Sequence, residues 1–160
     1  MRIRVAEQAD HAAIWRVIEP IIRAGEVFAL PRDMSQAAAL AYWTASGNAV
    51  FVAEVEGEVL GTYFLHPNQQ GGGAHVANCG YATAVEANGR GIARAMCQHS
   101  LDYARAQGFR AMQFNIVIST NERAVRLWTG MGFDTVGRLP GAFLHPTLGY
   151  VDALVMYQTL

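Results

Sequence analysis

The chain is poor in cysteine, and this shortage limits what kind of protein it can be. Its two cysteines, Cys79 and Cys97, are too few to staple a fold of 160 residues and are not in a C-x-x-C spacing. A disulfide framework is therefore excluded, and we expect a reducing, cytoplasmic setting. His66, His75 and His99 form no metal-ligand spacing with the cysteines, so no metal site is expected.

Charge is also scarce and nearly balanced. Charged residues make up 16% of the chain and the formal net charge is −1, which favours neither a nucleic acid nor an anionic membrane as a partner. The stretch from Gly61 to Val85 carries no charge at all and is long enough to raise the question of a membrane span. Pro67, Asn68 and the run 71–73 divide it into two strands and a loop instead. The N-terminus shows no apolar signal core, so export is not expected.

What the chain does have is ample apolar material for one core. Hydrophobic residues make up 52% of a length typical of a single compact unit, so we expect one domain over residues 1–160. The hydrophobic periodicity predicts seven strands, at about 2–6, 50–55, 59–65, 74–85, 111–118, 133–139 and 150–157. It predicts four helices, from about 11 onward, at 35–46, at 91–107 and from about 121. Pro20 should bend or end the first one.

This order indicates an α/β (α+β) fold, with a mixed central sheet of about six to seven strands flanked by about four helices. The uncharged run 111–120 is typical of a strand that is buried on both faces. Residues 140–149, with two prolines and two glycines, are expected to form a loop between the last two strands.

The segment with most chemical information is the turn Asn88-Gly89-Arg90-Gly91-Ile92-Ala93, where a strand meets the longest predicted helix. Unpaired amides at a helix start favour anions, and small residues let a pyrophosphate approach the main chain. A plain turn that uses glycine for positive φ explains these letters about equally well. A dinucleotide fingerprint requires a small residue in place of Arg94, and a P-loop requires Gly-Lys-Ser/Thr; neither is present.

Two motifs together resemble the GNAT superfamily of acyl-coenzyme A dependent N-acyltransferases. The phosphate-binding motif of that family, Arg/Gln-x-x-Gly-x-Gly/Ala, appears as Asn88-x-x-Gly91-x-Ala93. A second family motif is matched downstream by Asn121, Ala124, Leu127-Trp128 and Gly132-Phe133. The predicted order of elements also agrees with the GNAT fold along nearly the whole chain. The closing stretches 137–143 and 148–156 resemble those of a bacterial subgroup whose substrate is undefined.

The resemblance implies acetyl-CoA as co-substrate and a set of residues that bind it. That set is Ala82, Thr83, Val85, Asn88, Gly89, Arg90, Gly91, Ile92, Ala93, Arg94, Asn121, Ala124 and Trp128. Thr83 and Val85 would offer main-chain partners to the pantetheine arm in a gap between two strands, and an amide near Ala82 or Thr83 would stabilise the oxyanion.

Two residues depart from the family pattern. Asn88 is shorter than the usual Arg or Gln, so backbone amides must do most of the phosphate binding. Trp128 stands where many relatives have a tyrosine that protonates the leaving thiolate, and an indole N–H does not release its proton at useful pH.

No catalytic base is obvious from the sequence. Glu54, Asn115, His145 and Tyr150 are candidates, and Asn115 and Tyr150 are the two we predict to be catalytic. Each candidate also has a structural explanation. Glu54 fits a solvated strand residue, His145 a solvent-facing loop residue, and Asn115 a residue that satisfies neighbouring backbone groups. Tyr150 could replace the missing acid or be packed at the start of a strand. A thiol with a pKa near about 8.5 also leaves without a dedicated acid, and water can deprotonate the amine.

The acceptor pocket implied by the resemblance has apolar, uncharged walls. Phe28, Leu30 and Pro31 would form one side, and the loop containing His145 the other. Such a lining favours a small amine or an amino-acid-like acceptor. Two other functions remain open: an acyl-CoA-binding sensor without turnover, and acetylation of protein N-termini or lysines. A homodimer is possible, as in many members of the resembled family.

Overall fold

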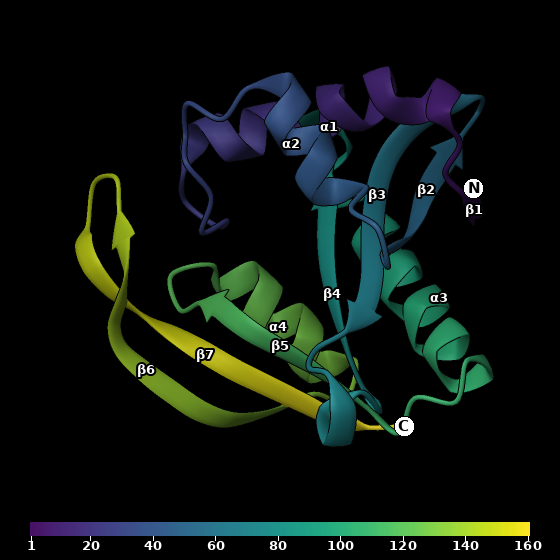
Figure 1. Cartoon of the computed structure of the whole chain (residues 1–160). Coiled ribbons are helices and arrows are strands. Elements are labelled where there is room, and N and C mark those ends of the chain that lie inside the picture. The colour runs from purple at the N-terminus through teal and green to yellow at the C-terminus, as the bar shows by residue number, and fades with distance from the viewer.

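The strands of this chain form one sheet in the order β1-β2-β3-β4-β5-β7-β6 (Figure 1). The computed structural model describes all residues from Met1 to Leu160. The strands are β1 (Arg2–Val5), β2 (Ala49–Val55), β3 (Glu58–Pro67), β4 (Val76–Thr83), β5 (Ala111–Ile118), β6 (Asp134–His145) and β7 (Gly149–Thr159). The helices are α1 (His11–Ala24), α2 (Gln36–Trp43), α3 (Ile92–Ala106) and α4 (Glu122–Gly130). The predicted mixed α/β sheet with four flanking helices is confirmed.

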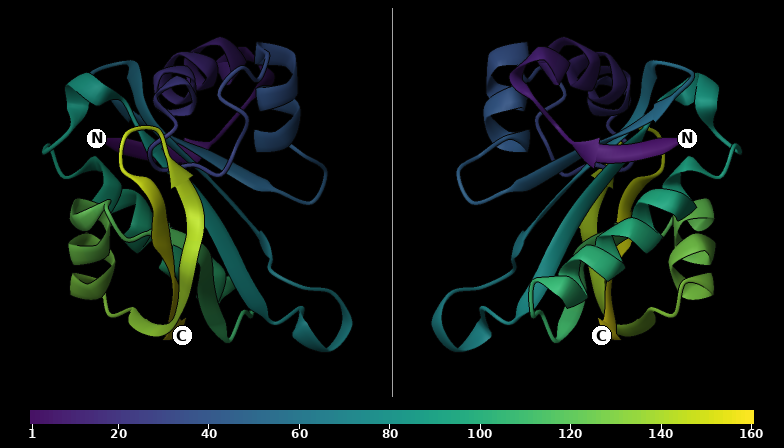
Figure 2. Two further views of the ribbon diagram at one scale, coloured as in Figure 1. Left: turned by 90° about the vertical axis from the view of Figure 1, so that its left-hand side faces the viewer. Right: turned by 90° about the vertical axis from the view of Figure 1, so that its right-hand side faces the viewer.

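The helices cover both faces of the sheet (Figure 2). On one face, the Trp43 indole N–H of α2 donates to Thr62 Oγ1 at 3.0 Å, and the Thr62 hydroxyl donates to the Phe51 carbonyl at 2.9 Å. On the other face, α3 packs against β3 so tightly that a Cβ on Gly61 would lie 2.9 Å from Ile92. This alternation along β3 produces a core on each side of the sheet.

The sheet divides between β4 and β5, its only parallel neighbours. They pair at Val76 with Ala111 and at Ala77 with Met112, and then diverge. The Asn78 side chain bridges the start of the divergence by donating to the Gln113 carbonyl at 2.9 Å. Figure 1 shows the two strands opening like a V toward α1 and α2. The gap expected between these strands is thus present.

Proline bears on two of the predicted boundaries. Helix α1 does not end at Pro20, which was one of the two outcomes expected there, but continues to Ala24, and Gly25, whose φ is 66°, is its C-cap. Strand β6 extends to His145 and includes Pro140, so residues 140–145 are not a loop. Both Pro140 and Gly141 lie at a register shift between Leu139 and Phe143 on the outermost strand, where a missing amide hydrogen bond is tolerated. None of the helices has the length and apolar character needed to cross a membrane.

Candidate active site

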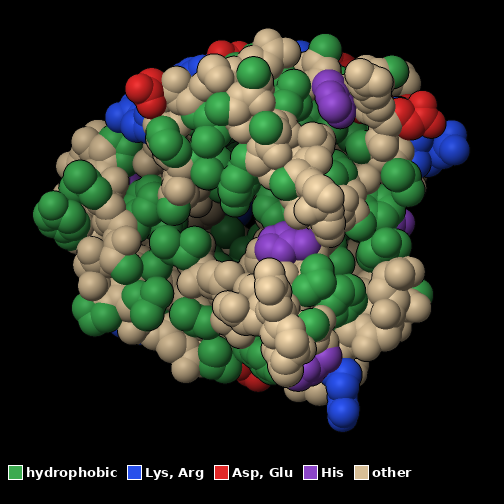
Figure 3. Space-filling model, in the orientation of Figure 1, with side chains coloured by type: hydrophobic (Ala, Val, Ile, Leu, Met, Phe, Trp, Pro, Cys, Tyr) green, Lys and Arg blue, Asp and Glu red, His purple; other side chains and the backbone are tan.

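A cavity of about 680 Å³ occupies the gap between β4 and β5. Figure 3 shows it as a hollow rimmed mostly by hydrophobic side chains. Its walls come from the end of α1, the following loop, α2, β3, β4, β5 and α4. The residues predicted from sequence that line it are Phe28, Leu30, Ala82, Thr83, Val85, Asn88, Ala93, Asn115, Asn121, Ala124 and Trp128.

The free main-chain groups of β4 face this cavity. The Ala84 amide donates to the Leu60 carbonyl of β3 at 2.9 Å, and the register of β3 and β4 is unbroken from Thr83 to Ala77. Because a strand alternates with period two, the amide and carbonyl of Ala82 also point to β3, while those of Thr83 point into the gap. Of the two residues expected to supply the main-chain donor, only Thr83 has an amide that faces the gap. Ala82 contributes only to the surface of the cavity wall.

The start of α3 is an uncapped helix N-terminus. Gly89 and Gly91 have φ of 85° and 79°, the left-handed region, and Gly91 is the N-cap without any side-chain cap bond. A Cβ at either glycine would meet nothing within 4 Å. Arg90 and Arg94 are exposed beside this turn, whereas the Ile92 side chain is buried in the core. The corner therefore presents free amides and is not filled by the chain's own side chains.

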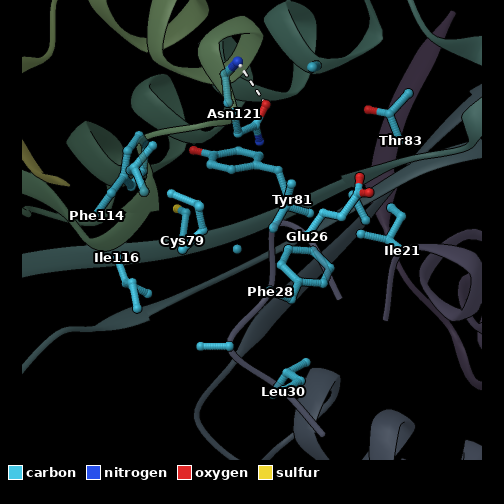
Figure 4. A pocket seen from close by; sticks show the side chains of 18 of the residues that line it. Ile21, Glu26, Phe28, Leu30, Cys79, Tyr81, Thr83, Phe114, Ile116 and Asn121 are labelled. Carbon is cyan, nitrogen blue, oxygen red and sulfur yellow. Dashed lines mark hydrogen bonds between the residues drawn. The ribbon is translucent and has the colours of Figure 1, made fainter. Parts of the chain in front are cut away.

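Helix α4 forms the wall of the cavity that lies opposite β4. Its N-cap Asn121 accepts from the Ala124 amide at 3.3 Å (Figure 4). Trp128 is 9% exposed and lies 5.0 Å from the Tyr81 ring and 5.1 Å from the Phe114 ring, between centroids. Trp128 therefore combines a packing role with a position at the cavity wall.

Tyr81 is the tyrosine that lies closest to Trp128 in this wall, yet it cannot replace a missing acid. Its hydroxyl is 2.7 Å from Ser100 Oγ, on the α3 side of the sheet. Burial raises the pKa of Tyr81 well above its ordinary value, so the phenol keeps its proton. Burial likewise raises the pKa of the Cys97 thiol to about 12, which makes it an inert core residue.

Most of the residues considered as a catalytic base either form hydrogen bonds with other side chains or lie away from the cavity. Glu54 accepts from Arg4 Nε at 3.1 Å and does not line the cavity. Asn115 lines the cavity but is exposed, accepts from Gln113 and donates to Asn68 Oδ1 at 2.7 Å, so β5 is not buried on both faces as expected. Tyr150 is 77% exposed on β7 and does not line the cavity.

The residues on the acceptor side of the cavity differ in part from those predicted to line it. Pro31 is exposed and lies outside the cavity, and His145 lines a second, smaller hollow of about 140 Å³. That hollow is lined by Glu26, Val27, Thr120, Asn121 and His145.

Sequence reasoning missed Glu26, which lines both hollows. It is the single carboxylate at either one, and Figure 4 shows it among the side chains of the larger cavity. The prediction of uncharged walls is therefore wrong. The available signal was an acidic residue two positions before Phe28, which was predicted to line the acceptor pocket.

Comparisons with known proteins agree with this geometry. The model of the acetyltransferase (GNAT) family matches residues 15–133. The chain belongs to the acetyltransferase (GNAT) family. A GCN5-related N-acetyltransferase from Kribbella flavida has 43% sequence identity to it and a TM-score of 0.94, with 99% of this chain and 97% of that chain covered. The enzyme class expected from the sequence, an acyltransferase, is thereby confirmed at the level of the GNAT family.

The curated relatives that match are longer than this chain. N-acetyltransferase aca1 of Schizosaccharomyces pombe is 34% identical over 101 residues, which are 62% of this chain and 48% of aca1. The chain thus spans about half the length of this relative. The structure of yncA from Salmonella typhimurium, solved with its cofactor acetyl-CoA, is 24% identical with a TM-score of 0.88 over 100% of this chain and 94% of that chain. At that identity the likeness shows the GNAT fold alone.

Proposed function

We propose that this GNAT chain transfers the acetyl group of acetyl-CoA to the primary amine of a small molecule or amino acid, by direct attack while both substrates are bound. The observation that carries the proposal is the uncapped start of α3 beside a cavity bounded by unpaired main-chain groups of β4. Amides at a helix N-terminus suit a pyrophosphate, and an apolar gap suits a pantetheine arm. The residues present therefore fit acetyl-CoA.

Each part of the site has a role in this proposal. The turn from Asn88 to Arg94 holds the diphosphate, with the backbone amides of Gly89, Gly91, Ile92 and Ala93 as donors and Arg90 and Arg94 as nearby cations. The Arg90 amide is not among these donors, because it donates to the Ala87 carbonyl at 3.3 Å. The main chains of Thr83 and Val85 bind the pantetheine. The Thr83 amide stabilises the oxyanion. Asn121, Ala124 and Trp128 line the thioester end of the cavity.

The acetyl transfer requires no covalent enzyme intermediate. The acceptor ammonium, with a pKa near about 10, first loses a proton, and its nitrogen then attacks the thioester carbonyl. The leaving thiolate, whose conjugate acid has a pKa near about 8.5, departs without a tyrosine acid at the Trp128 position.

We infer a cytoplasmic enzyme from the free, buried cysteines, and a homodimer from the exposed apolar residues Val136, Leu139 and Leu144 on the outermost strand.

A non-catalytic acyl-CoA sensor is the second candidate, favoured by Trp128 in place of the tyrosine. Measurement of thiol release with a panel of amines separates the two. A chain that binds acetyl-CoA in calorimetry but releases no thiol above the hydrolysis background with any amine is a sensor. Release with peptides but not with free amines would instead favour a protein acetyltransferase.

The phosphate corner is tested by Gly91→Glu. The carboxylate would cover the free amides and repel the diphosphate, so acetyl-CoA affinity should fall by at least about 100-fold in calorimetry. Gly108→Glu is the matched control, because Gly108 also has a left-handed φ, 84°, and open space around it, but lies at the other end of α3. Equal affinity of the two variants would contradict the proposed diphosphate site.

A further inference from the structure

Glu26 lies at the place where the two hollows meet, and it supplies the single negative charge that lines either of them. We propose that Glu26 binds the acceptor ammonium and takes its proton, and that the acceptor is an α-amino acid whose carboxylate is held in the smaller hollow. This inference rests on the proposed acetyl transfer and names both its base and its substrate class.

The loop that carries Glu26 is held in place by hydrogen bonds to its own backbone. Gly25 ends α1 in the left-handed conformation, and its amide donates to the Ile21 carbonyl at 3.3 Å. The Arg32 side chain lies where a Gly25 Cβ would be, at 2.5 Å from Cδ, and its Nε donates to the Arg23 carbonyl at 2.9 Å. Arg23 in turn donates to the Arg32 carbonyl. The position of Glu26 is therefore set by the turn directly before it.

Glu26 has no cation from this chain. Arg23, the nearest arginine in sequence, pairs with Glu19 at 3.6 Å, and the remaining ion pairs join other carboxylates. The larger cavity has a mostly hydrophobic lining that also includes one arginine, Arg123, and this arginine forms no ion pair with Glu26. Glu26 is an exposed carboxylate at the mouth of this lining, and without a partner from the chain it is suited to a cationic substrate group. A primary ammonium beside acetyl-CoA is such a group, and it must lose a proton before it can attack.

The rest of the smaller hollow offers hydrogen-bond donors. His145 Nδ1 accepts from the Thr147 and Leu148 amides, at 3.2 Å each, so the neutral ring carries its proton on Nε2 and presents a donor there. Asn121 uses Oδ1 to cap α4, which leaves its amide nitrogen free to donate. Thr120 adds a hydroxyl. One carboxylate facing several donors matches the opposite charges of a zwitterionic amino acid.

The proton and bond changes balance with these groups alone. One proton of the ammonium passes to the Glu26 carboxylate, and the freed nitrogen lone pair attacks the acetyl carbonyl carbon. The C–N bond forms and the C–S bond breaks, so the coenzyme leaves as a thiolate. A second proton from nitrogen converts the thiolate to the thiol, the amide keeps the third, and Glu26 returns its proton to water.

The substrate class is tested with pairs of acceptors that differ only in the carboxylate. Thiol release from acetyl-CoA is measured with leucine against 3-methylbutylamine and with phenylalanine against phenethylamine. The amino acids should have KM values about tenfold or more below those of the matched amines, as expected for charged hydrogen bonds. The chain contains no lysine, so its side chains do not add acceptor amines to the assay.

The donors are tested by Thr120→Val, which removes the hydroxyl from the smaller hollow and keeps a branched side chain of similar size. KM should rise for leucine and stay within about twofold for 3-methylbutylamine, which has no carboxylate to bind there. Equal effects on both acceptors, or equal KM values in the wild-type chain, would overturn the amino-acid assignment while leaving acetyl transfer intact.

The base is tested by Glu26→Gln, with Asp33→Asn as control, since Asp33 is exposed in the same loop and lines neither hollow. Glu26→Gln should lower kcat/KM by about 100-fold or more at pH 7 and leave acetyl-CoA affinity unchanged. The defect should shrink as pH rises and the free amine accumulates, which a merely structural loss would not produce. A defect that is constant with pH would refute the assignment of Glu26 as base. Absence of thiol release in the wild-type chain would instead refute the proposed function.

Discussion

At the scale of single residues, the charged groups near the N-terminus hold the fold together and are not available for chemistry. Arg4 donates to both oxygens of Asp10, at 2.8 and 2.9 Å, and to Glu54 at 3.1 Å. Asp10 also accepts from the Glu7 amide at 2.8 Å. The hydrogen bonds from Arg4 hold the pKa of Asp10 below its ordinary value of 3.8. Glu54, a candidate base from sequence, belongs to this structural network.

The network predicts a specific pH dependence of stability. Because the folded pKa of Asp10 is lowered, its contribution is complete above the unfolded pKa and is lost as pH falls through the folded pKa. Asp10→Asn should lower the free energy of unfolding by about 1.5–3 kcal/mol near pH 7. The difference from wild type should shrink below about pH 4 in urea titrations. A difference that is the same at pH 7 and pH 3 would show that the lost interaction is not that of the carboxylate.

Single residues also show where sequence reasoning stops. The glycines at 89 and 91 could be assigned to a phosphate-binding turn from sequence, because a positive φ favours glycine and the start of a helix has a recognisable sequence pattern. Glu26 could not be assigned in this way, since its significance depends on two hollows brought together by α1, β5 and the end of β6. Contacts between segments so far apart in sequence leave no local pattern.

At the scale of elements, β4 is a strand with one paired edge and one free edge. The Ala84 amide donates to β3, and the direction of the amides alternates along a strand. We therefore expect the Gly80 and Ala82 amides to donate to β3 as well, and the Tyr81 and Thr83 amides to face the gap. A free edge inside a protein is an open row of donors and acceptors. The pantetheine of a bound acyl-CoA would complete that row.

Amide hydrogen exchange measured residue by residue checks this difference between the two edges. Without ligand, Gly80 and Ala82 should exchange slowly and Tyr81 and Thr83 should exchange at least about tenfold faster. Saturation with acetyl-CoA should slow Tyr81 and Thr83 selectively. Addition of acetyl-CoA to the Gly91→Glu variant should change neither pair. Uniform protection along β4 before the ligand is added would contradict a free edge.

The elements also divide into those that sequence predicts well and those it does not. The hairpin of β2 and β3, helix α3 and strand β5 were predicted within about two residues, because their apolar periods are strong. The structure excludes an end of the first helix at Pro20, one of the two outcomes expected there, and it replaces the loop expected at 140–145 by a strand. Both expectations treated proline as a break. Tertiary context overrode that rule, once within a packed helix and once at the edge of a sheet.

At the scale of the whole molecule, the cavity lies between two parts of the sheet that are joined by little strand pairing. Strands β1 to β4 form one part and β5, β7 and β6 the other, with a register of only two residue pairs between β4 and β5. A ligand that fills the gap contacts both parts. Binding of such a ligand should therefore raise the free energy of unfolding of the whole fold.

Thermal unfolding with acetyl-CoA measures this linkage. At a ligand concentration of 100 times Kd, the folded state should gain about 2.7 kcal/mol. For a domain of this length that gain corresponds to a rise in Tm of roughly 5–10 °C. The Gly108→Glu variant should keep this rise, because its substitution is remote from the phosphate corner. The Gly91→Glu variant should lose the rise while unfolding cooperatively without ligand. A full rise in Gly91→Glu would place acetyl-CoA elsewhere on the molecule, since the proposed site at the gap includes the uncapped amides that begin α3.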